Sequence, residues 1–385
     1  MSSTAKKTFR LGKADAKRIW LRAQRLDEYA PFGDGPEATR AAVEHLGYVQ
    51  IDTINVIERC HHQILFTRIP GYRRDHLHQA QTVDKTVFEY WTHALSYLPT
   101  RDMRFYVGAM QRDWQRRSAW FAPVRQDDVR KVLTRIRRQG ALTIRDIDDD
   151  VLVEKEHAWA SRKPSKRALQ LAFYRGLVTV SQRTGMLKTY ELMGRHFGWR
   201  RPPKPASEGA VLDYLLDRAL RSQGIVSLDS ACYPEPRRKP AMRRLIETRV
   251  RRSELVPVEL EGAGKLEHWA RPEALETTVD RAEGLVHILS PFDPLIHQRK
   301  RLQLFFDYEH RFEAYVPKQQ RLFGYFAQPV LVGDAIVAAV DLKTDRERQR
   351  LRVQQWTWIA NRSRRSHRQR IEEALHRFER FQLAH

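Results

Sequence analysis

Apolar positions recur every three to four residues in several stretches of the chain, a spacing typical of amphipathic helices. This spacing predicts helices over residues 13–25, 36–45, 127–139, 164–176, 211–222 and 240–252. Short apolar runs predict strands after residue 285, over 285–289, 312–316, 322–327, 330–332, 336–341 and 351–356. Gly333-Asp334 indicates a hairpin turn among them, and a basic helix is expected from residue 361.

One order of elements occurs twice along the chain. Each time a helix is followed by a short second element, a third helix and then extended residues. The short elements are 142–147 and 225–231, and the extended stretches are 177–192 and 255–260. This order is typical of a winged helix, which is a helix-turn-helix variant. The pattern therefore predicts an α+β protein with tandem winged-helix modules and a C-terminal antiparallel β subdomain.

Composition adds a strong positive charge. The 385 residues carry 69 Lys+Arg against 47 Asp+Glu, a formal net charge of +22 with a pI near 10.2. Such an excess favours a polyanionic partner, and nucleic acid is the first expectation. Cations cluster at the start of both third helices, where phosphates could bind: Arg162, Lys163, Lys166 and Arg167, then Arg237, Arg238, Lys239, Arg243 and Arg244. A solvated charge run is the alternative.

The cysteine content and the apolar runs indicate the cellular compartment of the protein. Two cysteines, Cys60 and Cys232, exclude a disulfide framework and fit a reducing compartment. The N-terminal residues contain no apolar run typical of a signal peptide, and no stretch is long enough to span a membrane. We therefore expect a cytoplasmic, nucleoid-associated monomer without a membrane partner.

The strongest candidates for catalytic residues lie in the stretch 46–57. It is mostly apolar, yet Gln50 and Asp52 lie two residues apart within it. In an extended segment, side chains at i and i+2 point the same way, so the Gln50 amide and the Asp52 carboxylate would project from the same side of the apolar segment. Burying a carboxylate without a partner is costly. Asp52 therefore either faces a cleft where it acts or caps a helix that starts near Thr53.

Nearby histidines are weaker candidates. Cys60, His61 and His62 invite a zinc interpretation, but adjacent residues rarely supply several ligands to one ion, and no spaced partner set is visible. We therefore predict no metal and no cofactor. His93, inside the aromatic stretch 88–99, could line a site or be a satisfied core histidine.

Several separated motifs together resemble the bacterial winged-helix DNA glycosylases, the AlkZ-like and YcaQ-like enzymes that unhook interstrand crosslinks. The resemblance covers nearly the whole chain and rests on these segments, in order: 50–55 (QIDTIN), 89–93 (EYWTH), 290–294 (SPFDP), 305–308 (FFDY), 311–317 (RFEAYVP) and 324–326 (GYF). One departure is visible, because Ala338-Ala339 stands where relatives typically have a Gly-Arg pair.

The resemblance implies a fold and a site. It implies tandem winged helices forming a C-shaped channel, with a third module near the N-terminus. The expected division is 9–122 for the module with the Gln-Ile-Asp motif, 123–204 and 205–284 for the other two, 285–360 for the β subdomain and 361–385 for the basic helix. Asp52 would activate water and stabilise an oxocarbenium-like state, and Gln50 would position water or substrate. Asn55, His61, His62 and His93 would line the site.

The resemblance also implies a reaction. The expected activity is monofunctional hydrolysis of the N-glycosidic bond of N7-alkylguanine, including unhooking of crosslinks, on double-stranded DNA and without lyase chemistry. A winged-helix regulator that only recognises DNA is the alternative, and a DNA-compacting protein that relies on charge is a third. Gln50 and Asp52 separate these hypotheses, because a regulator has no use for a carboxylate near a phosphodiester.

Overall fold

The computed structural model describes residues 8–115, 121, 124–147, 161–233, 235–276, 284–359 and 364–384. Contacts within the chain divide it into two compact units. Unit 1 comprises Met1–Arg74, Thr92–Leu95 and Leu212–His385, and unit 2 comprises Asp75–Trp91 and Ser96–Val211. The predicted five-part division is not tested by this result and stays a prediction.

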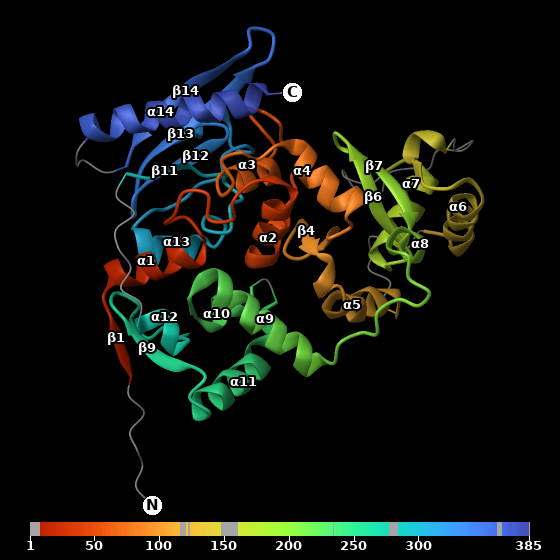
Figure 1. Ribbon diagram of the computed structural model, residues 1–385, viewed down its shortest axis with the longest axis horizontal. Coiled ribbons are helices and arrows are strands. Elements are labelled where there is room, and N and C mark those ends of the chain that lie inside the picture. The colour runs from red at the N-terminus through yellow and green to blue at the C-terminus, as the bar shows by residue number, and fades with distance from the viewer. Residues whose placement is uncertain are drawn as a thin grey trace, which may run out of the picture. The chain divides into compact units, whose positions relative to one another are not determined.

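Unit 1 contains two four-stranded sheets and the helices around them (Figure 1). Its helices are α1 (Lys13–Ala23), α2 (Gly35–Leu46), α3 (Cys60–Phe66), α9 (Glu208–Gln223), α10 (Leu228–Ala231), α11 (Lys239–Arg251), α12 (Pro272–Glu276), α13 (Arg299–Phe306) and α14 (Arg364–Leu383). Its strands are β1 (Phe9–Leu11), β2 (Val49–Gln50), β8 (Ile225–Val226), β9 (Val256–Leu260), β10 (His268–Ala270), β11 (Val286–Ile288), β12 (Ala327–Val332), β13 (Ala335–Asp345) and β14 (Arg350–Trp358). The 3₁₀ turns Pro236–Arg238 and Lys318–Gln320 complete it.

The two sheets of unit 1 differ in construction. One has the order β1-β9-β10-β8, with β1 parallel to β9. The other is an antiparallel meander in the order β11-β12-β13-β14, with the β12–β13 turn at Gly333 as predicted. Helix α14 lies across this second sheet in Figure 1 and buries Ile371 and Phe378. The antiparallel sheet and the basic C-terminal helix are therefore confirmed.

Between α1 and α13 lies a core that holds a buried cation. Arg301 is stacked between Trp20 and Phe305, with its guanidinium carbon 4.3 and 4.4 Å from the two ring centroids. It donates to the carbonyls of Gln223 and Ile225 at the end of α9 and on β8. Aromatic faces and two carbonyl oxygens, both bound to Nη2, therefore take the place of a carboxylate, while the buried Nε has no hydrogen-bond partner among the described residues.

Unit 2 is built from shorter elements. They are α4 (Arg74–His78), a π-helical turn (Gln79–Val83), β3 (Val87–Trp91), β4 (Leu95–Pro99), a 3₁₀ turn (Thr100–Asp102), α5 (Arg104–Gln115), α6 (Gln126–Gln139), β5 (Leu142–Thr143), a second 3₁₀ turn (Ile144–Asp146), α7 (Pro164–Tyr174), β6 (Val178–Thr184), β7 (Leu187–Leu192) and α8 (Met193–Phe197). Within it, the buried Glu89 carboxylate accepts from Arg183 at 2.5 and 2.6 Å. Glu89 therefore has a structural partner.

The predicted repeat has matching strand pairing in the two units. In unit 2 the order is α6, β5, α7 and the hairpin β6–β7, and β5 pairs antiparallel with β7. In unit 1 the order is α9, β8, α10, α11 and the hairpin β9–β10, and β8 pairs antiparallel with β10. Each short second element begins with two strand residues and continues as a short helical turn.

Two predicted strands are wrong. Residues 312–316 and 322–326 form no strand, although their apolar pattern suggested one. The Glu313 carboxylate instead accepts from the backbone N–H groups of Leu322, Phe323 and Gly324, and Asp341 accepts from those of Tyr325 and Phe326. Carboxylates thus satisfy backbone donors that a neighbouring strand would otherwise satisfy. Phe292, Phe312 and Phe326 pack together beside this segment.

Some expectations fall outside the described residues. The sequence also predicts an amphipathic helix with a basic face over residues 100–122, and its Arg116, Arg117 and Trp120 lie there, as does Arg362 of the C-terminal segment. In the part of the chain that is described, no helix combines the length and apolarity that crossing a membrane requires.

Candidate active site

The Gln-Ile-Asp motif lies just after α2, and local chemistry sets where this helix begins and ends. The Asp34 carboxylate caps the first backbone N–H, and Pro36 occupies the first turn. Gly47 ends the helix with φ 79°. This left-handed φ favours glycine, and a Cβ there would also meet the Arg218 side chain. The chain then leaves directly into Tyr48 and β2.

Gln50 is buried and its carbonyl end is fixed. The side chain is 7% exposed. Its Oε1 accepts a hydrogen bond from His93 Nε2 at 2.9 Å, and its backbone carbonyl accepts from the Cys60 thiol at 3.2 Å. The amide nitrogen makes no hydrogen bond to any residue in the described ranges. Gln50 therefore keeps two N–H donors available for a ligand.

His93 belongs to an aromatic cluster. Its ring stacks on His297 with centroids 4.6 Å apart, and Tyr48 meets both rings edge-on. Burial lowers the pKa of His93 to about 4 and that of His297 to about 3, so both are neutral at pH 7. A neutral His93 that donates through Nε2 holds the Gln50 carbonyl without adding charge. Tyr233, with 44% of its surface exposed, covers the pair.

A small cavity of about 30 Å³ lies against this cluster, large enough for about one water. Tyr48, His93, Arg218, Tyr233 and His297 contribute to its wall. Arg218 also lies over the Tyr48 ring at 5.7 Å. The cluster therefore combines a cation, aromatic faces and a small cavity, and His93 connects it to Gln50, which does not itself line the cavity.

Asp52 does not cap a helix, so that alternative is wrong. No helix starts near Thr53, and α3 begins only at Cys60. The Asp52 Oδ1 instead accepts from the backbone N–H of Ile54 at 2.7 Å, which is the hydrogen bond of an Asx-turn. A carboxylate that accepts from the residue two positions on favours a turn over a helix.

Asp52 is a half-buried carboxylate without a cation. Burial raises the pKa of its carboxyl above the usual range, while the backbone N–H groups of Ile54 and Thr53 act in the opposite direction. No ion pair joins it to any residue that the structure describes. A raised pKa and an unpaired carboxylate are what a general base requires.

The other predicted lining residues have partners of their own. Asn55 is exposed, and its Oδ1 accepts from Arg346 at 3.0 Å. His61 and His62 pack ring against ring at 4.3 Å, and His62 Nδ1 is 2.7 Å from the Tyr72 hydroxyl. Burial lowers the pKa of His62 to about 4. The structure therefore brings His93 to Gln50 and ties His62 to Tyr72.

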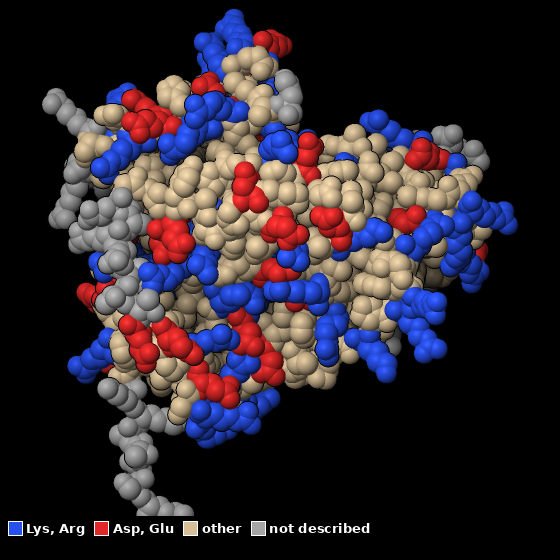
Figure 2. Space-filling view, in the orientation of Figure 1, with Lys and Arg blue, Asp and Glu red and all other residues tan. Residues whose placement is uncertain are grey.

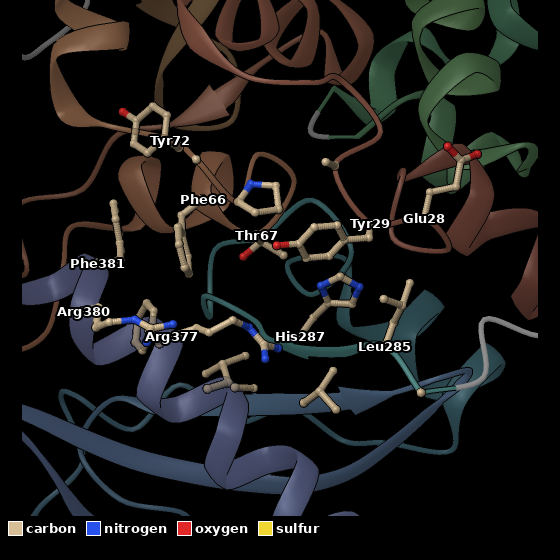
Figure 3. Close-up of a pocket in the computed structure, with 18 of the residues that line it drawn as sticks. Glu28, Tyr29, Phe66, Thr67, Tyr72, Leu285, His287, Arg377, Arg380 and Phe381 are labelled. Atoms are coloured by element: carbon tan, nitrogen blue, oxygen red, sulfur yellow. The ribbon is translucent and has the colours of Figure 1, made fainter.

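Tyr72 in turn lines a second cavity, of about 380 Å³, between α14, the end of α3 and β11 (Figure 3). Its wall includes the aromatic rings of Phe66 and Phe381, which are stacked at 4.2 Å, and Arg377 and Arg380 extend from α14. Neither Gln50 nor Asp52 is among its lining residues. Within the described ranges, no three His, Cys, Asp or Glu side chains come together as a metal site would require.

The two predicted groups of DNA-binding cations differ in their surroundings. At the start of α7, Arg162, Lys163 and Lys166 form no ion pair with a described residue. Near the start of α11, Arg238 pairs with Glu235, Lys239 with Asp229 and Arg243 with Glu267. In Figure 2, red and blue side chains alternate around α11, whereas blue predominates around α6 to α8. Arg237 and Arg244 are exposed and form no ion pair with a described residue.

The departure at Ala338-Ala339 lies in the interior. Both residues are fully buried in the middle of β13, paired with β12 on one side and β14 on the other. Their small size suits a packed sheet.

Sequence reasoning missed several residues around the motif. Tyr48, which directly precedes β2, and His297, three residues after the Ser290–Pro294 motif, complete the aromatic cluster. Their proximity to quoted motifs was the available signal. Arg346, far away on the β13–β14 turn, gave no signal, because its contacts to Asn55 exist only in the folded chain.

A family model and a solved structure match this chain. The sequence model of the family described as DNA glycosylase AlkZ-like matches residues 43–381, a range that contains Gln50, Asp52 and His93. Among solved structures, the Streptomyces sahachiroi DNA glycosylase AlkZ is similar, with a TM-score of 0.60 and 15% identity over 97% of each chain. At that identity the structural match supports the fold, and the family match carries the activity.

Proposed function

The chain belongs to the DNA glycosylase AlkZ-like family, and we propose that it hydrolyses the N-glycosidic bond of N7-alkylguanine in double-stranded DNA and unhooks crosslinks at that atom. The observation that carries the proposal is the pair formed by an unpaired, half-buried Asp52 and a Gln50 amide held by His93. These two residues suit a reaction in which the positive charge of the alkylated guanine already makes the base a good leaving group.

The chemistry needs little acid catalysis. Alkylation at N7 places a positive charge on guanine, so the base leaves with the bonding electrons of the C1′–N9 bond and becomes neutral. The sugar passes through an oxocarbenium-like state, which a nearby carboxylate stabilises. Water then adds to C1′ and its proton passes to Asp52. The Gln50 N–H donors would hold this water or the sugar phosphate.

A water nucleophile is favoured over an amine. A lyase reaction requires an amine that forms a Schiff base with C1′. No lysine is among the residues that the described contacts place on Gln50 or Asp52. We therefore propose monofunctional hydrolysis by a monomer.

We propose that DNA lies along tandem winged helices arranged as a C-shaped channel. Support comes from the shared pairing of β5 with β7 and of β8 with β10, and from the cations at the starts of α7 and α11. A guanine tethered to the opposite strand cannot swing fully into a closed pocket, so an open basic channel suits this substrate better.

The central experiment is single-turnover release of N7-methylguanine from duplex DNA, with a nitrogen-mustard crosslink as a second substrate. Asp52→Asn should lower the rate by about 10²–10⁴-fold, a typical contribution of a general base, while DNA affinity stays within about twofold. Asp334→Asn, at a partly exposed carboxylate on the β12–β13 turn that lies 3.9 Å from Arg18, serves as the control. An Asp52→Asn variant as fast as the wild type would refute the catalytic assignment.

The DNA-binding assignment has its own test. Replacing Arg162, Lys163 and Lys166 with alanine should weaken binding and reduce the slope of log Kd against log salt by about 0.9 per lost phosphate contact. Replacing Arg237 and Arg244 should act in the same direction. An unchanged salt slope in both variants would exclude a phosphate role for these residues.

A further inference from the structure

The turn between β13 and β14 reaches the loop that follows Asp52. Arg346 Nη2 is shared among three acceptors, the Asn55 carbonyl at 3.1 Å, the Asn55 Oδ1 at 3.0 Å and the Ile57 carbonyl at 3.0 Å. The backbone N–H of Thr344 donates to the carbonyl of Val56 at 2.9 Å. Four contacts from one hairpin therefore hold three consecutive residues of the loop.

The hairpin end is itself well fixed. Asp345 Oδ1 accepts from the backbone N–H of Arg348, and the Gln349 amide donates to the Arg346 carbonyl at 2.7 Å. Thr344 Oγ1 bonds to Gln382 on α14, which ties the strand to the C-terminal helix. Because these hydrogen bonds fix the hairpin end, it restrains the loop residues that it contacts.

The loop has few restraints of its own. Residues 51–59 contain no helix or strand. Ile51 N–H donates to the Leu95 carbonyl at one end, and the Glu58 carboxylate accepts from Arg74 at the other. Between them the Asp52 carboxylate accepts from the backbone N–H of Ile54, and the Ile57 side chain is fully buried. The place of the Asp52 carboxylate therefore depends on what holds residues 55–57.

We infer that Arg346 is a positioning residue for the reaction: its guanidinium fixes the loop at Asn55 and Ile57 and so keeps the Asp52 carboxylate at the reacting sugar. This inference rests on the proposed function for its catalytic consequence. Misplacing a catalytic group by about 1 Å can cost up to 10²-fold in rate. Loss of Arg346 should therefore slow the chemical step without removing any group that touches substrate.

The same turn provides a matched control. Arg348 is exposed, and its side chain makes no hydrogen bond or ion pair with a described residue. If the turn acted by attracting DNA, Arg346→Ala and Arg348→Ala would weaken binding to a similar extent. If Arg346 positions the loop, only its own loss changes the rate.

The experiment combines single-turnover release of N7-methylguanine with hydrogen exchange of residues 53–58 in the free protein. Arg346→Ala should slow release about tenfold and keep DNA affinity within about twofold. The acid limb of the pH–rate profile should move to lower pH, because a loosened Asp52 is less buried and burial is what raises its pKa. Arg346→Lys should recover part of the rate, and Arg348→Ala should match the wild type. Exchange in the loop should rise in Arg346→Ala alone.

Two outcomes would overturn the inference. One is an Arg346→Ala variant with wild-type loop exchange, and the other is an equal loss of rate in Arg348→Ala. The exchange measurement does not depend on activity. If the wild type releases no base, the proposed function fails, while loop exchange still decides whether Arg346 restrains the loop.

Discussion

Asp52 and Asp293 form the same local turn, but among the described residues only Asp293 is paired with a cation. Each carboxylate Oδ1 accepts from the backbone N–H two residues on, Ile54 at 2.7 Å and Leu295 at 3.0 Å. Asp293 is fully buried and also accepts two hydrogen bonds from Arg68, at 2.8 and 3.0 Å. Asp52 is half-buried and has no cation among its described neighbours.

The comparison shows what separates a structural carboxylate from a reactive one. The local turn is common to both and cannot explain the difference. Arg68 lies in the interior, where Gln24 and Ile64 also accept from it, so the Asp293 charge is neutralised within a closed network. Asp52 keeps its charge and an oxygen free to act, at a cost in stability, which is typical of functional sites.

The largest effect on stability is expected at the closed network. Asp293→Asn leaves the Arg68 guanidinium buried beside a neutral amide, and breaking such a pair costs about 3–5 kcal/mol. Urea unfolding followed by circular dichroism measures the change. Glu259→Gln, which breaks the exposed pair with Arg10, is the control and should cost less than about 1 kcal/mol. Equal effects of the two variants would show that burial does not govern the Asp293 pair.

A smaller effect is expected at the support of Gln50. His93→Phe keeps an aromatic ring between Tyr48 and His297 but removes the donor to Gln50 Oε1. The amide can then rotate, and single-turnover release should slow about tenfold, equivalent to about 1.4 kcal/mol. DNA affinity should not change. Tyr233→Phe, in the same cluster, should retain the rate; a slow Tyr233→Phe with a fast His93→Phe would contradict this account of Gln50.

Periodicity predicted much of the fold, because an amphipathic helix needs only local information. The helices 127–139 and 240–252 appear as α6 and α11 with ends shifted by one residue. The strands predicted over 312–316 and 322–327 failed, since Glu313 and Asp341 satisfy that backbone from a distance. Apolar alternation alone does not reveal where the hydrogen-bond partner lies.

The site was predictable only in part, for the same reason. Gln50 and Asp52 stand out in sequence as polar residues in an apolar stretch. The motif at 290–294 also contains a carboxylate, but this Asp293 is neutralised by Arg68, 225 positions away. Partners that are remote in sequence decide which carboxylate remains unpaired, and no spacing rule indicates them.

The pH dependence of the rate should test whether Asp52 is the general base. A general base must be ionised, so the rate falls as pH decreases through the pKa of Asp52, which burial raises. The acid limb should therefore lie above about pH 3.9, the value for an ordinary Asp, and should be absent from the residual rate of Asp52→Asn. His93 protonates at about pH 4, so His93→Phe identifies its contribution. A limb that persists unchanged in Asp52→Asn would assign it to another group.

The smallest effect concerns stability at Asp52 itself, with a sign opposite to that at Asp293. Because the folded-state pKa of Asp52 is raised, its ionised form destabilises the fold at neutral pH, and this cost disappears as pH falls below the unfolded value of about 3.8. Asp52→Asn should raise Tm by about 1–2 °C at pH 7, and the gain should vanish near pH 3–4. Calorimetry of Asp52→Asn and Asp293→Asn from about pH 3 to pH 7 tests whether the two changes in Tm have opposite signs. If Tm instead falls in Asp52→Asn, as it should in Asp293→Asn, the surroundings stabilise the ionised Asp52. That result would contradict a general base whose pKa is raised by burial.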